Sequence, residues 1–390
     1  MENFFKSVLS VCLLLSIIGC SKSGSEGHEK KPQTFYLVVN DSIEVPYLGL
    51  VDLMDVDPQQ ELLLFHDIQQ GSILLADFAG QHLLNLKRRG DSPQDYGRFL
   101  WSPARISPQG KIYLTSHRGY FEYDRNGELA KHTRLQQEVS LSGRAAADQE
   151  FQIYNGHFYQ SGISRNASFG TNQKEFYDEF QLMVRINPEN GELTRFLHLE
   201  EASVLKNGRG HDIGDMIPVF QIVNDHLYVI VAKDPHLNIY HLDDPGTLVK
   251  RVPLNYREFQ IGEGQPLETV DPRMISPSMT IGKTYALKNV DDFLLTTYFP
   301  GIDRQDQEIY EQIFSGEEYR VFFDRMRKKY PYRLHITDLD GNRLVDMELP
   351  EKLDQRQFLV RDGKLWFLSR FNQETEEDFV KVYQVGLEIK

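Results

Sequence analysis

The stretch GKIYLTSHRGYFEYDRNGEL, residues 110–129, carries the pattern that decides the fold. A turn ending in glycine precedes a short strand of alternating apolar residues. A second strand rich in tyrosine and phenylalanine follows, and an Asp-x-x-Gly turn closes the phrase. Phrases of the same kind recur along the chain, at residues 61–86, 110–129, 155–191, 224–243, 291–342 and 362–385. The recurrence predicts six copies of one small antiparallel sheet.

Six such sheets favour a closed ring. Repeats of about 40–50 residues that each form a sheet are typical of β-propellers. One sheet cannot bury both of its apolar faces alone, whereas a ring buries them against neighbouring sheets. Residues 35–39 and 43–47 are spare strands, and we expect them to complete the last blade and close the ring. The sequence thus predicts an all-β, six-bladed β-propeller as a single domain over residues 34–390. A β-sandwich, or a ring of seven or eight blades, remains the alternative.

Two insertions interrupt the repeat. Residues 308–330 place apolar side chains at helical spacing, and Gly316 is expected to divide this helical insertion near 305–330 into two short helices. Residues 165–179 form a polar loop that leads into aromatic residues. Loops of this size on a propeller usually lie at one rim, where binding residues gather.

The N-terminus has the pattern of a lipoprotein signal peptide over residues 1–19. Lys6 supplies a positive charge, and residues 7–18 form an apolar run that is shorter than the ~20 residues needed to span a bilayer. Gly19 and Cys20 then end the run as a lipobox does, so we expect Cys20 to be acylated as the first residue of the mature protein. An ordinary signal peptide that happens to contain a cysteine is the alternative.

The residues that follow are expected to tether the body to a membrane. Residues 20–33 are polar and rich in glycine and serine, so they cannot bury apolar area and should form a flexible tether. Ser21 occupies the position where an inner-membrane retention signal usually has aspartate, which favours the outer membrane. A periplasmic and a surface-exposed location both remain open.

Composition excludes several classes of function. The two cysteines are Cys12, in the signal peptide, and Cys20, so the mature body has no thiol for a disulfide, a metal site or a nucleophile. The net charge of −14 argues against DNA or RNA as a partner, because phosphate binding needs a basic face. The sequence contains no Gly-x-Ser-x-Gly, His-Glu-x-x-His, Walker-type or Gly-x-Gly-x-x-Gly motif, and we expect no cofactor.

One phrase links the chain to a known group. Residues 90–96, Gly-Asp-Ser-Pro-Gln-Asp-Tyr, resemble the Gly-x-Gly-Pro-Gly-Glu-Tyr/Phe phrase of TolB-like six-bladed β-propeller lipoproteins of Bacteroidota, many of which are domains of unknown function. Ser92 and Gln94 stand where that phrase has glycines. Residues 298–300 and 376–378 are also similar to that group. The resemblance spans the whole body and implies the fold and an envelope location, but no reaction.

The densest polar group of interest is His211, Asp212 and Asp215. These residues could bind a metal or supply a base near the propeller axis. The favoured interpretation is a solvated inter-blade loop in which the aspartates form turns, because no partner ligands can be placed from sequence. We expect three other histidines of the fourth repeat to be surface or inter-blade residues: His226, His236 and His241.

Adjacent carboxylates occur at residues 243–244, 291–292 and 376–378. Neighbours on a strand point to opposite faces, so these doublets are poor candidates for the facing carboxylate pair of a glycosidase. We expect them in turns.

Residues 325–329 are the one basic run in this acidic protein. Arg325 and Arg327, beside Tyr330, could present a positive patch to an anionic partner. The alternative is that they supply favourable charge at the C-terminus of a helix.

Together these features favour a non-catalytic binding or scaffold propeller, anchored to the outer membrane through its N-terminal lipid. It would engage a protein or a glycan through residues 165–180 and 301–331. The alternative is a hydrolase or lyase that uses a metal or polar residues in the central channel. Converging carboxylates and histidines in the channel would favour the enzyme, and an apolar plug or a bare channel would favour the binding protein.

Overall fold

The computed structural model describes residues 34–137, 141–142, 145–164, 168–273, 278–371 and 377–390, without the side chains of 141–142 and 163–164. The expected signal peptide, Cys20 and the tether lie outside the described residues, as does Glu376. None of the helices in the described part of the chain is long and apolar enough to cross a membrane.

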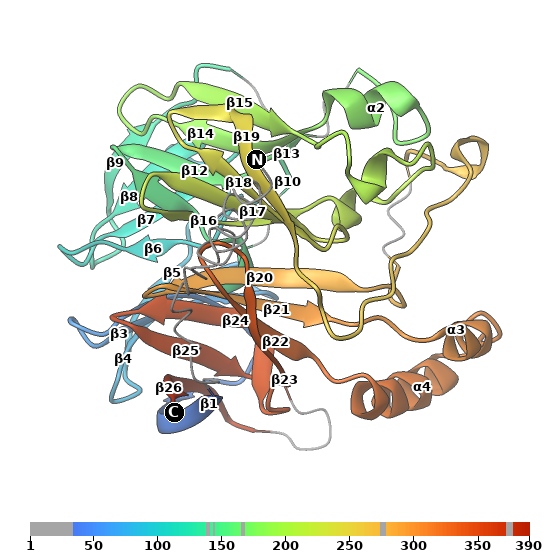
Figure 1. The fold of residues 1–390 in the computed structure, drawn as a ribbon. Helices are drawn as coiled ribbons and strands as arrows, with labels where there is room; N and C mark the ends of the chain where they lie inside the picture. Colours follow the sequence, from blue (N-terminus) through green and yellow to red (C-terminus); the bar gives the residue numbers. More distant parts are fainter. Residues whose placement is uncertain (1–33, 138–140, 143–144, 165–167, 274–277, 372–376) are drawn as a thin grey trace, which may run out of the picture. The chain divides into compact units, whose positions relative to one another are not determined.

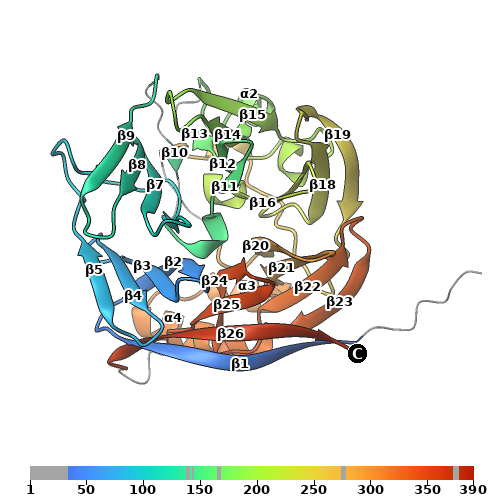
Figure 2. The same cartoon turned by 90° about the vertical axis from the view of Figure 1, so that its left-hand side faces the viewer.

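Six four-stranded antiparallel sheets follow one another around a ring (Figure 2). Blade 1 is β2 (Val51–Asp57), β3 (Leu62–Asp67), β4 (Ile73–Asp77) and β5 (His82–Leu86), and blade 2 is β6 (Arg105–Ile106), β7 (Ile112–Ser116), β8 (Gly119–Tyr123) and β9 (Leu129–Thr133). Blade 3 is β11 (Gln152–Tyr154), β12 (His157–Ser161), β14 (Gln181–Ile186) and β15 (Leu193–His198), and blade 4 is β16 (Pro218–Val223), β17 (His226–Val231), β18 (His236–His241) and β19 (Asp244–Pro253). Blade 5 is β20 (Lys283–Val290), β21 (Phe293–Phe299), β22 (Arg333–Asp338) and β23 (Arg343–Glu348), and blade 6 is β24 (Leu353–Arg361), β25 (Lys364–Ser369), β26 (Phe379–Ile389) and β1 (Phe35–Pro46). The predicted six-bladed propeller is confirmed.

Blade 6 joins the two ends of the described chain. β1 is its outer strand and pairs antiparallel with β26, from Phe35 opposite Ile389 to Pro46 opposite Phe379. Figure 2 shows β1, in blue, running beside the red β26. The two separate spare strands expected from sequence are one continuous strand, because a bulge between Val39 and Asp41 lets both halves follow β26.

The core is divided among the contacts between blades. Each pair of neighbouring blades shares one apolar cluster, so each blade buries both of its faces. Leu64 of blade 1 and Phe121 of blade 2, for example, belong to one cluster and are fully buried. The cluster between blades 6 and 1 includes Val45 of β1 and Trp366 of β25, so the closing strand is part of the core.

The blade topology gives the ring two different faces. Connections from the second to the third strand, and from one blade to the next, lie on one face, which we call the helical face. It carries α2 (Lys174–Glu179), α3 (Arg304–Tyr310) and α4 (Gly316–Lys329), all on the right of Figure 1. The hairpins within each blade lie on the opposite face of the ring, which we call the turn face. β1 begins on the turn face, because Phe35 pairs with Ile389 at the end of β26.

Both insertions lie on the helical face. The first was expected to be only a loop, yet its end forms α2, in which Phe176 and Tyr177 are buried. The second forms two helices as predicted, and Gly316 is the first residue of α4. The remaining short elements are β10 (Leu141–Ser142), β13 (Ile163–Ser164) and the 3₁₀ turns η1 (Ala147–Gln149), η2 (Val204–Lys206), η3 (Ile213–Asp215) and η4 (Leu267–Thr269).

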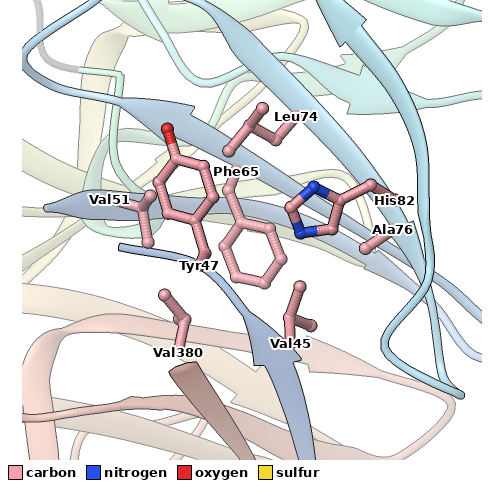
Figure 3. Close-up of a pocket in the computed structure, with 8 residues that line it drawn as sticks. All are labelled: Val45, Tyr47, Val51, Phe65, Leu74, Ala76, His82 and Val380. Atoms are coloured by element: carbon pink, nitrogen blue, oxygen red, sulfur yellow. The ribbon is translucent and has the colours of Figure 1, made fainter. Parts of the chain in front are cut away.

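A small apolar cavity lies where β1 meets blade 1 (Figure 3). Its volume is about 10 Å³, about the room that one water molecule needs. In Figure 3 the side chains that surround it come from β1, blade 1 and β26, namely Val45, Tyr47, Val51, Phe65, Leu74, Ala76, His82 and Val380. The cavity is a packing gap at the closing seam and is too small for a ligand.

Candidate functional site

Charged side chains from five segments meet inside the ring. Asp55 of β2 and Arg105 of β6 join Glu150, which follows η1, and Lys288 of β20 and Arg361 of β24 complete what we call the axial cluster. Arg361 donates from Nε to Asp55 Oδ1 at 2.9 Å, and its second terminal nitrogen is 3.6 Å from Glu150 Oε2. Lys288 Nζ lies 3.2 Å from Glu150 Oε2, and Arg105 Nε lies 3.9 Å from Asp55 Oδ2. Blades 1, 2, 5 and 6 are therefore linked by ion pairs, with the segment before blade 3 among them.

The 3₁₀ turn η1 brings Glu150 into the cluster. This turn belongs to the connection between blades 2 and 3, yet it packs against β24, β2 and β20. Lys288 also donates to the carbonyl of Ala147 at 2.8 Å, which fixes the turn. Burial raises the pKa of Glu150, but Lys288, Arg361 and Arg105 outweigh it and lower the pKa to about 2. Glu150 is therefore a stably charged carboxylate at neutral pH.

The interior of the ring matches neither of the two expected outcomes. Asp55 and Glu150, the carboxylates of the axial cluster, are paired with arginine and lysine, so the interior is not apolar. Among the residues that the structure describes, no group of three or more histidine, cysteine, aspartate or glutamate side chains is arranged to bind a metal ion.

A second polar group lies at the rim, on the helical face. His211 and Asp215 precede β16, Lys233 follows β17, and Lys283 begins β20; we call these four residues the rim cluster. Lys233 Nζ donates to His211 Nδ1 at 2.9 Å, and Lys283 Nζ lies 3.8 Å from Asp215 Oδ1. His211, Asp215 and Lys233 are each less than 5% exposed, so the expectation of a solvated loop was wrong for His211 and Asp215. Asp212 caps η3 by accepting a hydrogen bond from the Gly214 amide at 2.7 Å, which is the turn role expected for it.

Both ring nitrogens of His211 are used inside the protein. Because Lys233 donates to Nδ1, the proton lies on Nε2, which donates to Asn207 Oδ1 at 3.1 Å. The His211 amide also donates to the Tyr177 hydroxyl at 2.7 Å, which ties the loop to α2. Burial, together with Lys233 and Arg209, lowers the pKa of His211 to about 3. His211 is thus a neutral residue that holds two loops together.

The pKa values of the other three residues of the rim cluster are also shifted in the direction that favours the neutral form. Burial raises the pKa of Asp215 despite the nearby Lys283 and Lys233. Burial likewise lowers the pKa of Lys233 and of Lys283, although Asp215 opposes the shift in both. Gly264 lies against the His211 ring, since a Cβ there would be 2.5 Å from Cε1. The loop after β19 therefore covers the rim cluster.

A shallow pocket opens beside the rim cluster. It has a volume of about 80 Å³ and is bordered by Lys174, Tyr177, Asp178, Glu201, Leu205, Lys206, Gly208, Arg209 and Leu267. Lys206 is paired with Glu201 at 2.5 Å, and Arg209 donates to the Gly264 carbonyl at 3.1 Å. Tyr177 lines this pocket and also contacts His211, so the pocket and the rim cluster share one wall.

The basic run of α4 is neutralised within the helical insertion. Arg327 pairs with Asp324, and Arg325 lies 3.7 Å from Asp306. Tyr330 is buried and donates to Asp306 Oδ2 at 2.7 Å. Lys329 Nζ donates to the same Asp306 oxygen at 2.6 Å. Arg325, Lys329 and Tyr330 thus brace α4 against α3 through Asp306, whereas the pair of Arg327 and Asp324 lies within α4. They are separate from His211, Asp212 and Asp215, which lie in the connection between blades 3 and 4, although both segments belong to the helical face.

The tip of the same insertion is exposed and apolar. Phe314 is 90% exposed, and Val321, Ile309 and Tyr319 are also exposed. Ser315 and Glu318 form a capping box at the start of α4, which fixes the backbone beside Phe314. Beneath the tip the two helices have an apolar cluster of their own, which includes Phe322 and Met326. The exposed apolar side chains of the tip are thus carried by two helices and the turn between them, whose backbone is fixed by the capping box and by packing beneath it.

Sequence reasoning missed all five residues of the axial cluster and the two lysines of the rim cluster. Lys288 lies in KTYALKNV and Asp55 in VDLMDVD, each a charge inside an otherwise buried strand. That pattern was the available signal, because a buried charge requires a partner. The partners themselves lie in distant parts of the chain.

Stability should fall as the pH drops from about 6.5 to 4.5. Burial lowers the pKa of His211 and of His335 below the ordinary 6.5, so the unfolded chain binds protons in this range that the native protein does not. Each histidine then contributes up to about 1.4 kcal/mol per pH unit. Urea unfolding at pH 7, 6 and 5 measures the slope, and His211→Gln should reduce it by about one proton. An unchanged slope in that variant would contradict the buried neutral state of His211.

Comparisons with known proteins support the fold. No protein-family model matches the chain, and no curated protein matches its sequence. Among solved structures, a member of the DUF4221 family from Bacteroides vulgatus is similar over 92% of this chain and 99% of its own, with a TM-score of 0.62 and 12% identity. A Bacteroides fragilis protein described as exported covers 92% of this chain and 96% of its own, with a TM-score of 0.45 and 11% identity. A gluconolactonase from Xanthomonas campestris covers 89% and 90%, with a TM-score of 0.43 and 11% identity. At 12% identity the likeness to the Bacteroides vulgatus protein shows a shared six-bladed propeller fold and nothing finer.

Proposed function

We propose that this chain is an outer-membrane lipoprotein of the TolB-like propeller group and that its body is a binding module for another protein. The signal peptide, Cys20 and the polar tether support the anchor. β1 begins on the turn face, so the tether joins the body there and the helical face is free for a partner. A glycan partner is a less favoured form of the same proposal.

The exposed tip of the helical insertion is the observation that carries the binding role. Single exposed apolar residues are ordinary, but four on one short capped hairpin are characteristic of an interaction surface. Glu308, Glu311 and Glu317 are exposed around the tip. The chemistry fits a partner with an apolar cleft and a basic rim.

The enzymatic alternative has less support. A hydrolase or lyase in the channel needs carboxylates or histidines that can meet a substrate or a metal. The described carboxylates of the axial cluster are instead fixed by Arg361, Lys288 and Arg105, and both nitrogens of His211 are used.

A photo-crosslinking amino acid at position 314, in the full chain expressed in its native cells, tests the proposal. Crosslinking to a specific protein is expected at 314 and not at Val249, which is 51% exposed on the outer strand of blade 4. Phe314→Ser should then weaken binding of the purified partner by about 2 kcal/mol or more, as loss of an aromatic hot spot does. The same variant should change stability by less than about 0.5 kcal/mol, because the side chain is exposed.

Two results would count against this surface. One is equal crosslinking at positions 314 and 249, which would mean that the tip is not selective. The other is undiminished binding by Phe314→Ser. Glu311→Lys together with Glu317→Lys tests the charge separately, and it should weaken binding to a basic partner.

A further inference from the structure

Two histidines face each other on the turn face of blade 4. His226 is the first residue of β17 and His241 is the last residue of β18, and the two are directly opposite in the antiparallel ladder. Their ring centroids are 4.4 Å apart and the rings are tilted by 38°. His241 is exposed and His226 is half-buried. Both rings are therefore in contact with each other and within reach of solvent.

The ring of His226 is already oriented by its own turn. Its Nδ1 lies 2.9 Å from the carbonyl oxygen of Asn224, so Nδ1 carries the proton and donates it. Nε2 consequently keeps its lone pair. Histidines that bind metals almost always donate their second ring nitrogen in this way, because the bond fixes both the tautomer and the ring orientation. The Asn224 carbonyl gives His226 this support.

We propose that His226 and His241 bind one divalent transition-metal ion together. Imidazole suits Zn²⁺, Cu²⁺ and Ni²⁺, whereas Ca²⁺ and Mg²⁺ prefer oxygen ligands. Because no third histidine or carboxylate among the described residues is arranged as a ligand with them, water completes the coordination. The site is thus open and exchangeable, and its metal is not a structural one. It lies on the face opposite the helical insertion and does not depend on the proposed partner.

The chain contains a matched control in blade 3. His157 begins β12 as His226 begins β17, and its Nδ1 lies 3.0 Å from the carbonyl oxygen of Asn155. The next strand, β14, ends at Ile186 beside Phe158, so the ladder places no histidine opposite His157. The two positions share the turn and the hydrogen bond and differ in the facing residue. Only the blade 4 position can supply two imidazoles.

Calorimetric titration with ZnCl₂ and NiCl₂ tests the proposal, on the chain from residue 20 with Cys20→Ser and without a histidine tag. One ion per chain is expected at the site. His241→Gln and His226→Gln should each weaken binding by more than about tenfold, since loss of a ligand should cost at least as much as loss of a supporting hydrogen bond. His157→Gln should bind as the parent does. Circular dichroism of each variant checks that the fold is intact.

A spectroscopic measurement identifies the ligands independently. Electron paramagnetic resonance with one equivalent of Cu²⁺ should show nitrogen couplings from two imidazoles, and one of the two should disappear in His241→Gln. The chain has other histidines, 12 in all, so the variants decide the location. Absence of binding in the parent, or equal binding in the parent and His241→Gln, would overturn the proposal.

Discussion

Glu150→Ala should lower the free energy of unfolding by about 3–5 kcal/mol, as expected when one partner of a buried ion pair is removed. Glu150 is 8% exposed and holds Lys288 and Arg361 at 3.2 and 3.6 Å. Alanine leaves Lys288 without a carboxylate partner and Arg361 with Asp55 alone, and the two buried cations repel each other. Urea unfolding followed by tryptophan fluorescence measures the change, because Trp101 and Trp366 are both buried.

The same substitution at an exposed pair is the control. Glu189 is paired with Lys131 at 2.7 Å, but its side chain is 77% exposed. Glu189→Ala should therefore cost no more than about 1 kcal/mol. A second variant, Glu150→Gln with Lys288→Met, removes both charges and should recover part of the loss. If Glu150→Ala cost no more than Glu189→Ala, the axial cluster would not stabilise the ring.

A chain that begins at Tyr47, and so lacks β1, should show no cooperative unfolding transition. Phe35, Ile43 and Val45 are buried, and each such side chain contributes about 1.5–3 kcal/mol. Their sum approaches the 5–15 kcal/mol by which domains are stable. The truncation also exposes the edge of β26, which invites aggregation. Urea unfolding and size-exclusion chromatography measure both effects.

Two further samples make this truncation informative. A chain that begins at Thr34 retains β1 and should unfold with the stability of the mature protein. A peptide of residues 34–46 added to the truncated chain should restore the transition by pairing with β26, as strand addition does elsewhere. An unchanged transition midpoint without the peptide would show that β1 is dispensable.

Local chemistry explains why the blades could be predicted. Turns such as Asp362-Gly363 have positive φ angles of 52° and 69°, which tight hairpins require and which these residue types permit. Apolar alternation between such turns then marks each strand. The long-range contacts have no such local signature. Lys288 and Glu150 attract each other because the ring brings their segments together. The residues next to each of them in sequence do not indicate its partner.

In the candidate site, too, local features could be predicted and long-range contacts could not. The turn role of Asp212 was predicted, because a side chain that caps its own turn acts locally. The neutral state of His211 was not predicted, since it depends first on the burial of its ring and then on Lys233, from another loop. Arg327 and Tyr330 were considered for an anionic partner, but they are occupied by Asp324 and Asp306 of the same insertion. The exposure of Phe314 likewise depends on how the two helices pack.

The pairing of β1 with β26 also constrains the order of folding. Synthesis delivers β1 first and β26 last, so the two strands that complete blade 6 meet only after every other blade has been made. A native contact between the two ends of a chain gives a high contact order, which slows folding. Ring closure cannot occur before β26 has emerged from the ribosome or the translocon. The nascent protein must therefore remain open until β26 is available to pair with β1.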